Sequence, residues 1–268
     1  MTDRPETARW LSAEEKQLAI ARVKSERVGV SEHLDKVNGK KTWLGMVSPV
    51  TISTGLIFLF TNITVQGLAF FLPTIVRTIY PGTTTVQQQL RTVPPYIVGT
   101  FSTIFVAWGA WMLDRRNLFI IGSAPFVMTG YIMFLASTNP QVRYAATFLI
   151  TLAAFNNGTL TNAQVTANLL SDTARSSGIG LNVMLGNIGG LISTWAFLPF
   201  DGPNYPIGNG LNLATSSSIL VISALLWLWM VHDNKRRDRI DVDAKLAGMS
   251  SKEIEDLDWR HPGFRWKY

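Results

Sequence analysis

The sequence predicts an all-α membrane protein, in which a bundle of six membrane-crossing helices lies between two charged ends. The mean hydropathy of the 268 residues is +0.18, which is high for a soluble globular protein. Only nine charged side chains fall between residues 42 and 232, and all the others lie in the two ends. Within this apolar middle part, six stretches reach the roughly 20 residues that a helix needs to cross a bilayer. This composition is typical of an integral membrane protein.

Residues 1–48 form a polar segment ahead of the first span. Within it, residues 8–28 predict an amphipathic helix, because Ser12 precedes Glu15 at the spacing of a capping box. The apolar side of this helix would carry Leu11, Leu18, Ile20 and Val23. Such a helix either lies solvated beside the membrane or binds the membrane surface or a partner. Residues 1–20 lack the apolar core of a signal peptide, so we expect the first span to act as its own insertion signal.

The membrane domain is expected over residues 49–233. Its six spans are predicted at about 50–76, 93–113, 117–136, 144–170, 176–200 and 213–232. Two of the connections are very tight turns, DRR at 114–116 and SDTAR at 171–175. Residues 234–268 form a polar tail, in which Ser250 would cap another short helix.

An even number of spans places both ends of the chain on the same side of the membrane as the two tight turns. That side carries 21 of the 24 Lys and Arg residues, and the other side carries only Arg77, Arg91 and Arg143. The positive-inside rule then places both ends in the cytoplasm. We therefore interpret the net charge of +6 as an orientation signal and not as a nucleic-acid site. The expected location is the lipid bilayer of the plasma membrane.

The sequence offers no set of residues for enzymatic chemistry. It has no cysteine, and His33, His232 and His261 are too scattered to hold a metal ion together. There is no Ser/His/Asp set, no phosphate-binding loop and no pair of carboxylates. We therefore expect no enzyme and no bound metal or cofactor.

A polar stripe on the fourth span is the first candidate for a substrate site. The residues that recur at helical spacing and share this stripe are Asn157, Thr161, Gln164 and Asn168. Polar groups at membrane depth usually face protein or a water-filled cavity. The stripe is therefore either a substrate-facing wall or a source of hydrogen bonds between helices, each worth about 0.6 kcal/mol. Four such groups on one face favour the wall.

The fifth span combines glycines with amides. The residues that share one of its faces are Gly178, Asn182, Gly186, Gly189 and Ser193. Small residues let another helix approach closely, so we interpret this face mainly as a contact surface. Asn182 and Asn187 remain candidates for interhelical bonds or for lining a cavity.

Three further polar residues lie in the first two spans. Asn62 and Gln66 are one helical turn apart in the first span. Tyr96 follows two prolines near the start of the second span, where it either anchors the helix at the membrane interface or faces a cavity.

The tight turn after the second span places one carboxylate, Asp114, beside two guanidinium groups, Arg115 and Arg116. These charges could pair across the turn or bond the ends of nearby helices, or they could serve only to orient the chain. Arg175 occupies the other tight turn. We group these four residues as candidates for a gate at the cytoplasmic helix ends.

Six spans, an Asp-Arg turn after the second span and a glycine-rich fifth span resemble the carboxyl-terminal half of a major facilitator superfamily transporter. Shorter stretches resemble fungal permeases of the allantoate permease type, the anion:cation symporter family. These stretches are ETARWLSAEEKQLAIAR, LAFFLPTIV at 68–76, VPPY at 93–96, GNIGG at 186–190, DGPNYPIGNGLNL at 201–213 and HPGFRWKY at 261–268. The resemblance covers essentially the whole chain.

The resemblance implies a twelve-helix parent that takes up small organic anions, such as carboxylate nutrients or vitamins, by alternating access and with coupling to protons. Substrate would bind between the two halves near the membrane midplane. The implied cavity residues are Asn62, Gln66, Tyr96, Asn157, Thr161 and Gln164, with Asn182 and Asn187 less secure. The spans contain no titratable group at membrane depth, which the resemblance would place in the other half.

Three functions therefore compete on the sequence alone. The chain could be an active half that works with a second copy or with the missing amino-terminal half, which would cover its cavity face. It could instead be a truncated half without transport activity, inert or regulatory. An integral membrane enzyme or a channel is disfavoured, because neither catalytic sets nor charged pore rings occur.

Overall fold

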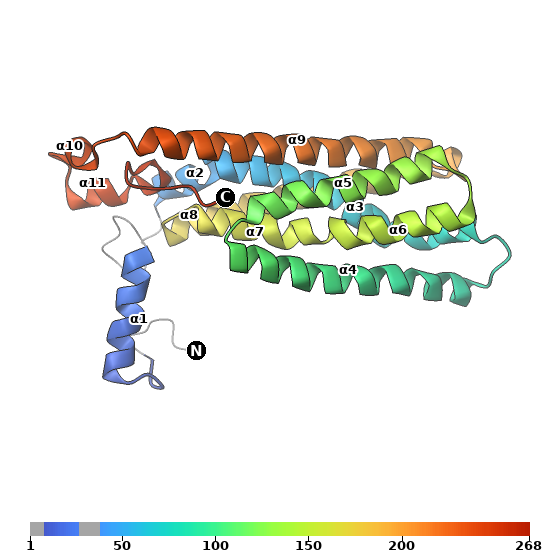
Figure 1. Cartoon of the computed structure of the whole chain (residues 1–268), viewed down its shortest axis with the longest axis horizontal. Coiled ribbons are helices and arrows are strands. Elements are labelled where there is room, and N and C mark those ends of the chain that lie inside the picture. Colours follow the sequence, from blue (N-terminus) through green and yellow to red (C-terminus); the bar gives the residue numbers. More distant parts are fainter. Residues whose placement is uncertain (1–7, 27–37) are drawn as a thin grey trace.

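The computed structural model describes residues 8–26 and 38–268, and over these ranges the chain is all-α without strands, which confirms the predicted fold class. Figure 1 shows a long bundle of helices that run side by side, with the small helices α1, α10 and α11 at one end. We call this the tail end, because the carboxyl-terminal segment, residues 238–268, also lies there. The helix expected over residues 8–28 falls partly outside the described residues.

The helices are α1 (Ala13–Glu26), α2 (Gly39–Val47), α3 (Pro49–Ile79), α4 (Thr85–Leu113), α5 (Arg116–Ala136), α6 (Pro140–Ala154), α7 (Asn156–Ala167), α8 (Asp172–Ser193), α9 (Pro206–Arg237), α10 (Val242–Leu246) and α11 (Ser251–Glu255). Two short 3-10 helices follow α8 and α11, at Pro199–Asp201 and Asp258–Arg260.

Local capping sequences set where several helices begin. The Ser12 hydroxyl accepts from the Glu15 amide at 3.3 Å, and the Glu15 carboxylate accepts from the Ser12 amide at 2.9 Å, which starts α1. Ser250 caps α11 in the same way. A third capping box, between Thr84 and Gln87, starts α4 well before the apolar stretch at residue 93. Reciprocal bonds of this kind satisfy amides that a helix start otherwise leaves unpaired.

Four helices, α3, α4, α5 and α9, are both long and apolar enough to cross a membrane. The helix α8 is 22 residues long, and its glycines, serines and asparagines make it less apolar. It ends at Ser193 and continues as tighter turns, in which the amides of Thr194, Trp195 and Ala196 donate three residues back. Pro199 then favours the extended backbone of Leu198, so no helix continues to residue 200. The span expected over residues 144–170 is divided into α6 and α7, which meet at Phe155.

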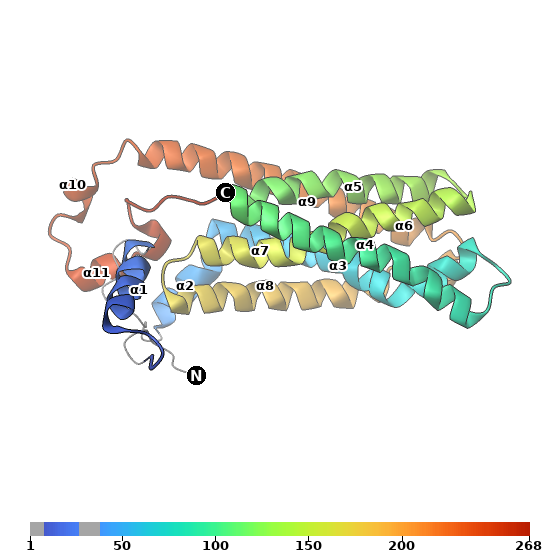
Figure 2. The same cartoon turned by 60° about the horizontal axis from the view of Figure 1, so that its bottom comes forward.

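The helices pack as two groups, which are joined where α3 packs against α9 and where α7 packs between α3 and α5. One group joins α3 to α8 along most of their length, and the other joins α5 to α9 and α6 (Figure 2). The close approach of α3 and α8 requires glycine, since a methyl group added at Gly189 would collide with the backbone carbonyl of Leu59. In a membrane the hydrophobic effect does not drive helices together, because lipid tails are as apolar as the side chains. Small residues at a crossing let the helices approach closely enough for van der Waals contacts to hold them together.

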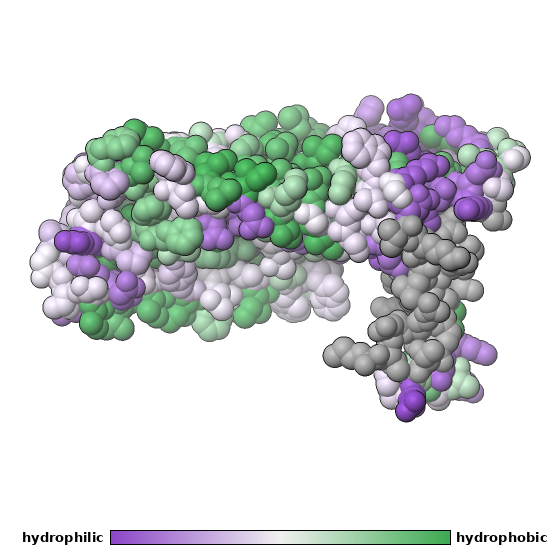
Figure 3. Space-filling model, turned by 180° about the vertical axis from the view of Figure 1, so that it is seen from behind, coloured by the Kyte–Doolittle hydropathy of each residue, from purple (hydrophilic) through white to green (hydrophobic). Residues whose placement is uncertain are grey.

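Large apolar side chains remain exposed on the outside of the bundle. On α4 the exposed ones include Val93, Ile97, Phe101, Ile104, Phe105 and Trp108. Figure 3 shows the same pattern from behind, with hydrophobic residues over much of the bundle and hydrophilic residues gathered at the tail end. A surface of this kind is stable against lipid acyl chains or against another apolar protein surface.

Candidate functional site

The interruption between α6 and α7 lies near the middle of the helical stretch that runs from Pro140 to Ala167. Asn156 follows it directly, and its Nδ2 donates to the Leu152 carbonyl at 3.0 Å and to Ser102 Oγ at 3.3 Å. Bonds from a side chain to a nearby carbonyl compete with the helical ladder and bend helices. Phe155 keeps right-handed helical dihedrals, φ −71° and ψ −23°, so the interruption is a local break in the hydrogen-bond ladder and not an unwound segment.

Tyr96 of α4 lies beside this interruption. Its ring centroid is 5.9 Å from that of Phe155, and its hydroxyl donates to the Leu68 carbonyl of α3 at 3.3 Å. The two rings line a hollow of about 350 Å³, whose other walls are Gly99, Thr100, Thr103 and Ile104. This hollow offers aromatic faces and two hydroxyl groups to a small ligand, and Tyr96 therefore faces a cavity.

Asn62 and Gln66 lie where α3 crosses the glycine face of α8. A methyl group at Gly186 would be 3.0 Å from Asn62 Nδ2, and one at Gly190 would be 3.5 Å from Gln66 Cγ. Both amides are half-buried. Asn62 Nδ2 donates to the Phe58 carbonyl of its own helix at 2.9 Å, whereas Gln66 makes no side-chain hydrogen bond to any described residue.

Two further amides lie next to this crossing. Asn182 of α8 donates from Nδ2 to Asn162 Oδ1 of α7 at 3.4 Å. Asn182 is fully buried, and its Oδ1 has no hydrogen-bond partner within the described ranges, whereas Asn162 is half-exposed. An unpaired buried acceptor costs about 1–3 kcal/mol. The sequence reasoning missed Asn162, although it directly follows Thr161 and so lies on the adjacent face of the same polar helix.

The stripe predicted as a substrate-facing wall lies inside the bundle. Asn157, Thr161 and Gln164 are at most 2% exposed. Ser123 of α5 donates to Asn157 Oδ1 at 2.8 Å, and the Thr161 hydroxyl donates to the Asn157 carbonyl at 2.8 Å. Gln164 Nε2 donates to the Lys267 carbonyl of the tail at 2.7 Å. These contacts support the other interpretation, hydrogen bonding within the bundle, because α5 and the tail cover the face.

Asn187 lies apart from the other candidates. It is exposed, and its Nδ2 donates to the Val183 carbonyl of its own helix at 2.9 Å. Its neighbours on that side of α8 include the exposed apolar residues Met184, Ile188 and Leu191. This amide therefore belongs to the outer surface of α8.

The residues brought together at the crossing form what we call the amide face: Asn62, Gln66 and Asn162, with Asn182 behind them and the Tyr96 hollow nearby. All of these groups are uncharged. They can donate and accept hydrogen bonds, but they neither take up nor release a proton at neutral pH. No group of three or more His, Asp or Glu residues in the described ranges could hold a metal ion. The geometry is that of a binding surface for a small polar molecule.

The charged turn pairs with itself and with the tail. Asp114 ends α4 in the left-handed conformation, at φ 48°, and its Oδ1 lies 3.0 Å from Arg116 Nη1. The Arg115 guanidinium lies 6.0 Å from the Tyr268 ring centroid. In the other tight turn, Arg175 Nε donates to a carbonyl at the end of the preceding helix at 2.7 Å.

Two asparagine side chains hold the tail against the bundle. Asn234 donates to the Trp266 carbonyl at 2.9 Å and accepts from the Trp266 amide at 2.8 Å. Asn168 does the same for Lys267, at 2.8 Å in both directions. Trp266 is 2% exposed and belongs to a buried apolar cluster with Val50, Leu170, Leu226, Met230 and Phe264. Local sequence patterns do not predict this contact, because the partners are distant along the chain.

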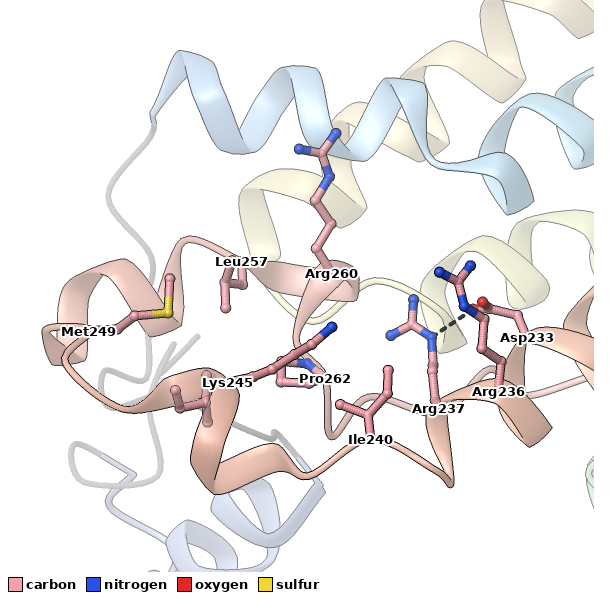
Figure 4. A pocket seen from close by; sticks show the side chains of 10 residues that line it. Asp233, Arg236, Arg237, Ile240, Lys245, Met249, Leu257, Arg260 and Pro262 are labelled. Atoms are coloured by element: carbon pink, nitrogen blue, oxygen red, sulfur yellow. Dashed lines mark hydrogen bonds and ion pairs between the residues drawn. The ribbon is translucent and has the colours of Figure 1, made fainter.

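An ion pair at the end of α9 fixes the start of the same segment. Arg237 Nε and Asp233 Oδ2 are 2.6 Å apart, on the wall of a hollow of about 320 Å³ (Figure 4). Arg237 Nη1 donates to the carbonyls of Trp259 and His261 at 3.2 and 3.1 Å. Burial, together with the charge of Arg237, lowers the pKa of His261 below its ordinary value of 6.5. The Arg237 side chain at this hollow therefore holds the tail in place through its ion pair and its bonds to two tail carbonyls.

Arg143, expected in a loop, lies in the first turn of α6 and is 4% exposed. Its Nη1 donates to Asn204 Oδ1 at 3.0 Å, and its guanidinium lies 5.4 Å from the Phe134 ring centroid. It thus fastens the loop before α9 to the far end of the bundle from the tail.

The sequence is similar to those of known transporters. A family model described as sugar (and other) transporter matches residues 2–242. The chain is 28% identical over 76% of its length to the MFS-type transporter cnsO of Penicillium expansum, covering 40% of that protein. It is 27% identical over 87% of its length to the high-affinity nicotinic acid transporter of Saccharomyces cerevisiae, covering 41%.

A third relative, the major facilitator-type transporter hxnP of Emericella nidulans, is 26% identical over 100% of the chain, which covers 54% of that protein. The chain thus spans about half the length of the curated relatives that it matches. No solved structure matches it.

Proposed function

This chain belongs to the sugar (and other) transporter family of major facilitator proteins, and on that premise we propose that it forms one six-helix half of a transporter for a small organic anion. The substrate would be a carboxylate nutrient or a vitamin-like solute, moved by alternating access. The observation that carries the proposal is the amide face beside the interrupted helix α6–α7. Transporters bind substrates near the midplane, where helices are interrupted.

The chemistry of the amide face suits a carboxylate on a flat ring. Amide N–H groups of Asn62 and Gln66 can donate to carboxylate oxygens, and such charge-assisted bonds are stronger than neutral ones. Tyr96 and Phe155 line the neighbouring hollow and offer ring faces to an aromatic substrate. One relative is described as a nicotinic acid transporter, and nicotinate has this shape and charge.

The proposed transporter needs a cover over the amide face. Half-exposed amides facing hydrocarbon are unfavourable, because lipid cannot satisfy their hydrogen bonds. On α4, only 11% of the most apolar window is buried, so its outer surface also remains for lipid or for a partner. We propose that a second six-helix unit, either another copy or an amino-terminal half, covers the amide face and supplies the proton-carrying group.

The test of the amide face is uptake of radiolabelled nicotinate by cells that produce the chain. Gln66→Leu and Asn62→Leu should each lower uptake about tenfold, the effect of losing one hydrogen bond to a charged ligand. Asn187→Leu is the matched control, because it removes an exposed amide that bonds only its own helix. Equal uptake by Gln66→Leu and the wild type at equal surface amounts would remove the amide face from the pathway.

Orientation and proton coupling are tested in the same cells. We propose that both ends of the chain lie in the cytoplasm of a cell whose plasma membrane contains the protein. An epitope after Tyr268 should then be stained only in permeabilised cells. A protonophore should abolish uptake if protons drive it, and unchanged uptake would contradict the coupling. If cells that produce the wild-type chain take up no more nicotinate than cells without it, transport by this chain is contradicted.

A further inference from the structure

A second hollow at the tail end, of about 530 Å³, lies between the start of α5, the end of α7 and the tail. We call it the basic hollow, because four cationic side chains line it: Arg116, Arg175, Arg265 and Lys267. The rest of its lining consists of small or apolar residues, and no acidic residue contributes. Two of the cations come from the bundle and two from the tail.

Buried and more exposed residues alternate along the tail segment that borders the hollow. Residues 264–268, Phe-Arg-Trp-Lys-Tyr, form no helix. Phe264 and Trp266 are buried in the apolar cluster at 4% and 2% exposure. Arg265 and Lys267 are more exposed and line the hollow together with Gly263 and Phe264. The bonds of Asn168 to the Lys267 backbone fix the position of this residue.

The acidic partners of three of these cations lie outside the lining of the hollow. Arg175 Nη1 lies 4.0 Å from Asp172 Oδ1, and the Asp172 side chain is 34% exposed. Asp114, which pairs with Arg116, has 59% of its side chain exposed, and Asp238, which pairs with Arg265, has 64% exposed. Exposed ion pairs of this kind contribute little, about 0–1 kcal/mol. Four like charges converging on a concave surface therefore leave a positive potential that attracts anions.

We propose that the basic hollow binds a phosphate group, and that the bound phosphate holds the tail against the bundle. A guanidinium group can bind two phosphate oxygens at once, as a bidentate donor. Arg116 and Arg175 place two guanidinium groups at the hollow. A ligand that contacts both the bundle and the tail binds only the docked arrangement, so it must stabilise docking. The site is independent of the amide face and of the transported substrate.

Two sources could supply the phosphate group. The hollow lies where α5 begins, at the level expected for lipid headgroups, and basic pockets between membrane helices at that level bind phosphorylated lipid headgroups. A soluble phosphate or phosphate ester could also enter from the aqueous side. The shared chemistry is a terminal, doubly charged phosphate group, and the experiment separates the sources.

The test uses the purified full chain in nanodiscs and measures hydrogen exchange of the tail peptide 262–268. Inorganic phosphate is titrated into phosphatidylcholine nanodiscs, with sodium chloride at equal ionic strength as the reference. In parallel, nanodiscs containing phosphatidylinositol 4-phosphate are compared with pure phosphatidylcholine. Saturable slowing of exchange by phosphate supports a soluble ligand, and slowing only by the phosphorylated lipid supports a headgroup.

Variants show whether the hollow is responsible. Lys267→Gln and Arg116→Gln should each weaken the response about tenfold, as expected for one lost charge-assisted contact. Lys267→Gln leaves the backbone bonds to Asn168 in place, so the tail can still dock. The controls Lys235→Gln and Arg239→Gln remove exposed cations outside both hollows. No saturable response, or equal weakening by the controls, would overturn the proposal.

Discussion

Replacing Asn168 by leucine should release the tail from the bundle. The wild-type side chain makes two hydrogen bonds to the backbone of Lys267, both at 2.8 Å, and one to the Gln164 carbonyl of its own helix at 2.9 Å. Leucine has a similar volume, so the loss is mainly one of hydrogen bonds and not of packing. The change thus isolates the contribution of the amide clamp to tail docking.

The expected size of the effect follows from these bonds. Two neutral hydrogen bonds contribute about 1 kcal/mol each, and leaving the Lys267 amide partly buried without this partner adds about 1 kcal/mol more. A loss of roughly 3 kcal/mol lowers the ratio of docked to undocked tail by a factor of about 100. Gln164 keeps its bond to the Lys267 carbonyl, which limits the loss to this range.

Hydrogen exchange of residues 262–268 measures this ratio directly, because amides exchange in the undocked state. Exchange in Asn168→Leu should be about 100 times faster than in the wild type, whereas Asn187→Leu should match the wild type. Asn234→Leu should have a similar effect, since Asn234 clamps Trp266 with the same pair of bonds. Wild-type exchange rates in both clamp variants would refute the docking geometry.

Two further predictions concern stability and pH. Gly189→Ala should lower the thermal midpoint, because its methyl group would meet the Leu59 carbonyl and such overpacking costs about 1–3 kcal/mol of stability. Gly180→Ala should not lower the midpoint, because its methyl group would meet no neighbouring atom. An equal midpoint for both variants would contradict the close α3–α8 crossing. The protection factor of the tail amides, which is the exchange rate corrected for the intrinsic effect of pH, should be constant above about pH 6.5 and should fall below it. The lowered pKa of His261 means that docking favours the neutral ring, whose Nδ1 accepts from the Gly263 amide at 3.1 Å. His261→Gln should lose this pH dependence.

Hydropathy located the long helices well, because a membrane span is defined by its own composition. The helix α5 begins and ends within one residue of the predicted 117–136. The helix α2, by contrast, was not predicted: it has nine residues and two lysines, and it is held by packing of Gly45 against Ala174 and Ser177 of α8. A short helix of that kind depends on a tertiary partner that local sequence does not reveal.

At the candidate site, too, local sequence does not reveal which elements pack against a predicted face. Helical periodicity correctly groups Asn157, Thr161 and Gln164 on one face, but it cannot say which element covers that face. Ser123 and the tail cover it, through contacts between residues far apart in the chain. Asn62 and Gln66 were recognised as polar residues one turn apart, and only the α3–α8 crossing shows that they remain half-exposed.

The most direct test of the amide face is accessibility of single cysteines, which the cysteine-free chain allows without background. Gln66→Cys and Asn62→Cys should react with a membrane-impermeant methanethiosulfonate reagent, and nicotinate should slow the reaction. Asn157→Cys should remain unreactive, because that position is 2% exposed. Reaction at Asn157→Cys with protection by nicotinate, and none at Gln66→Cys, would contradict the account and restore the buried stripe as the substrate wall.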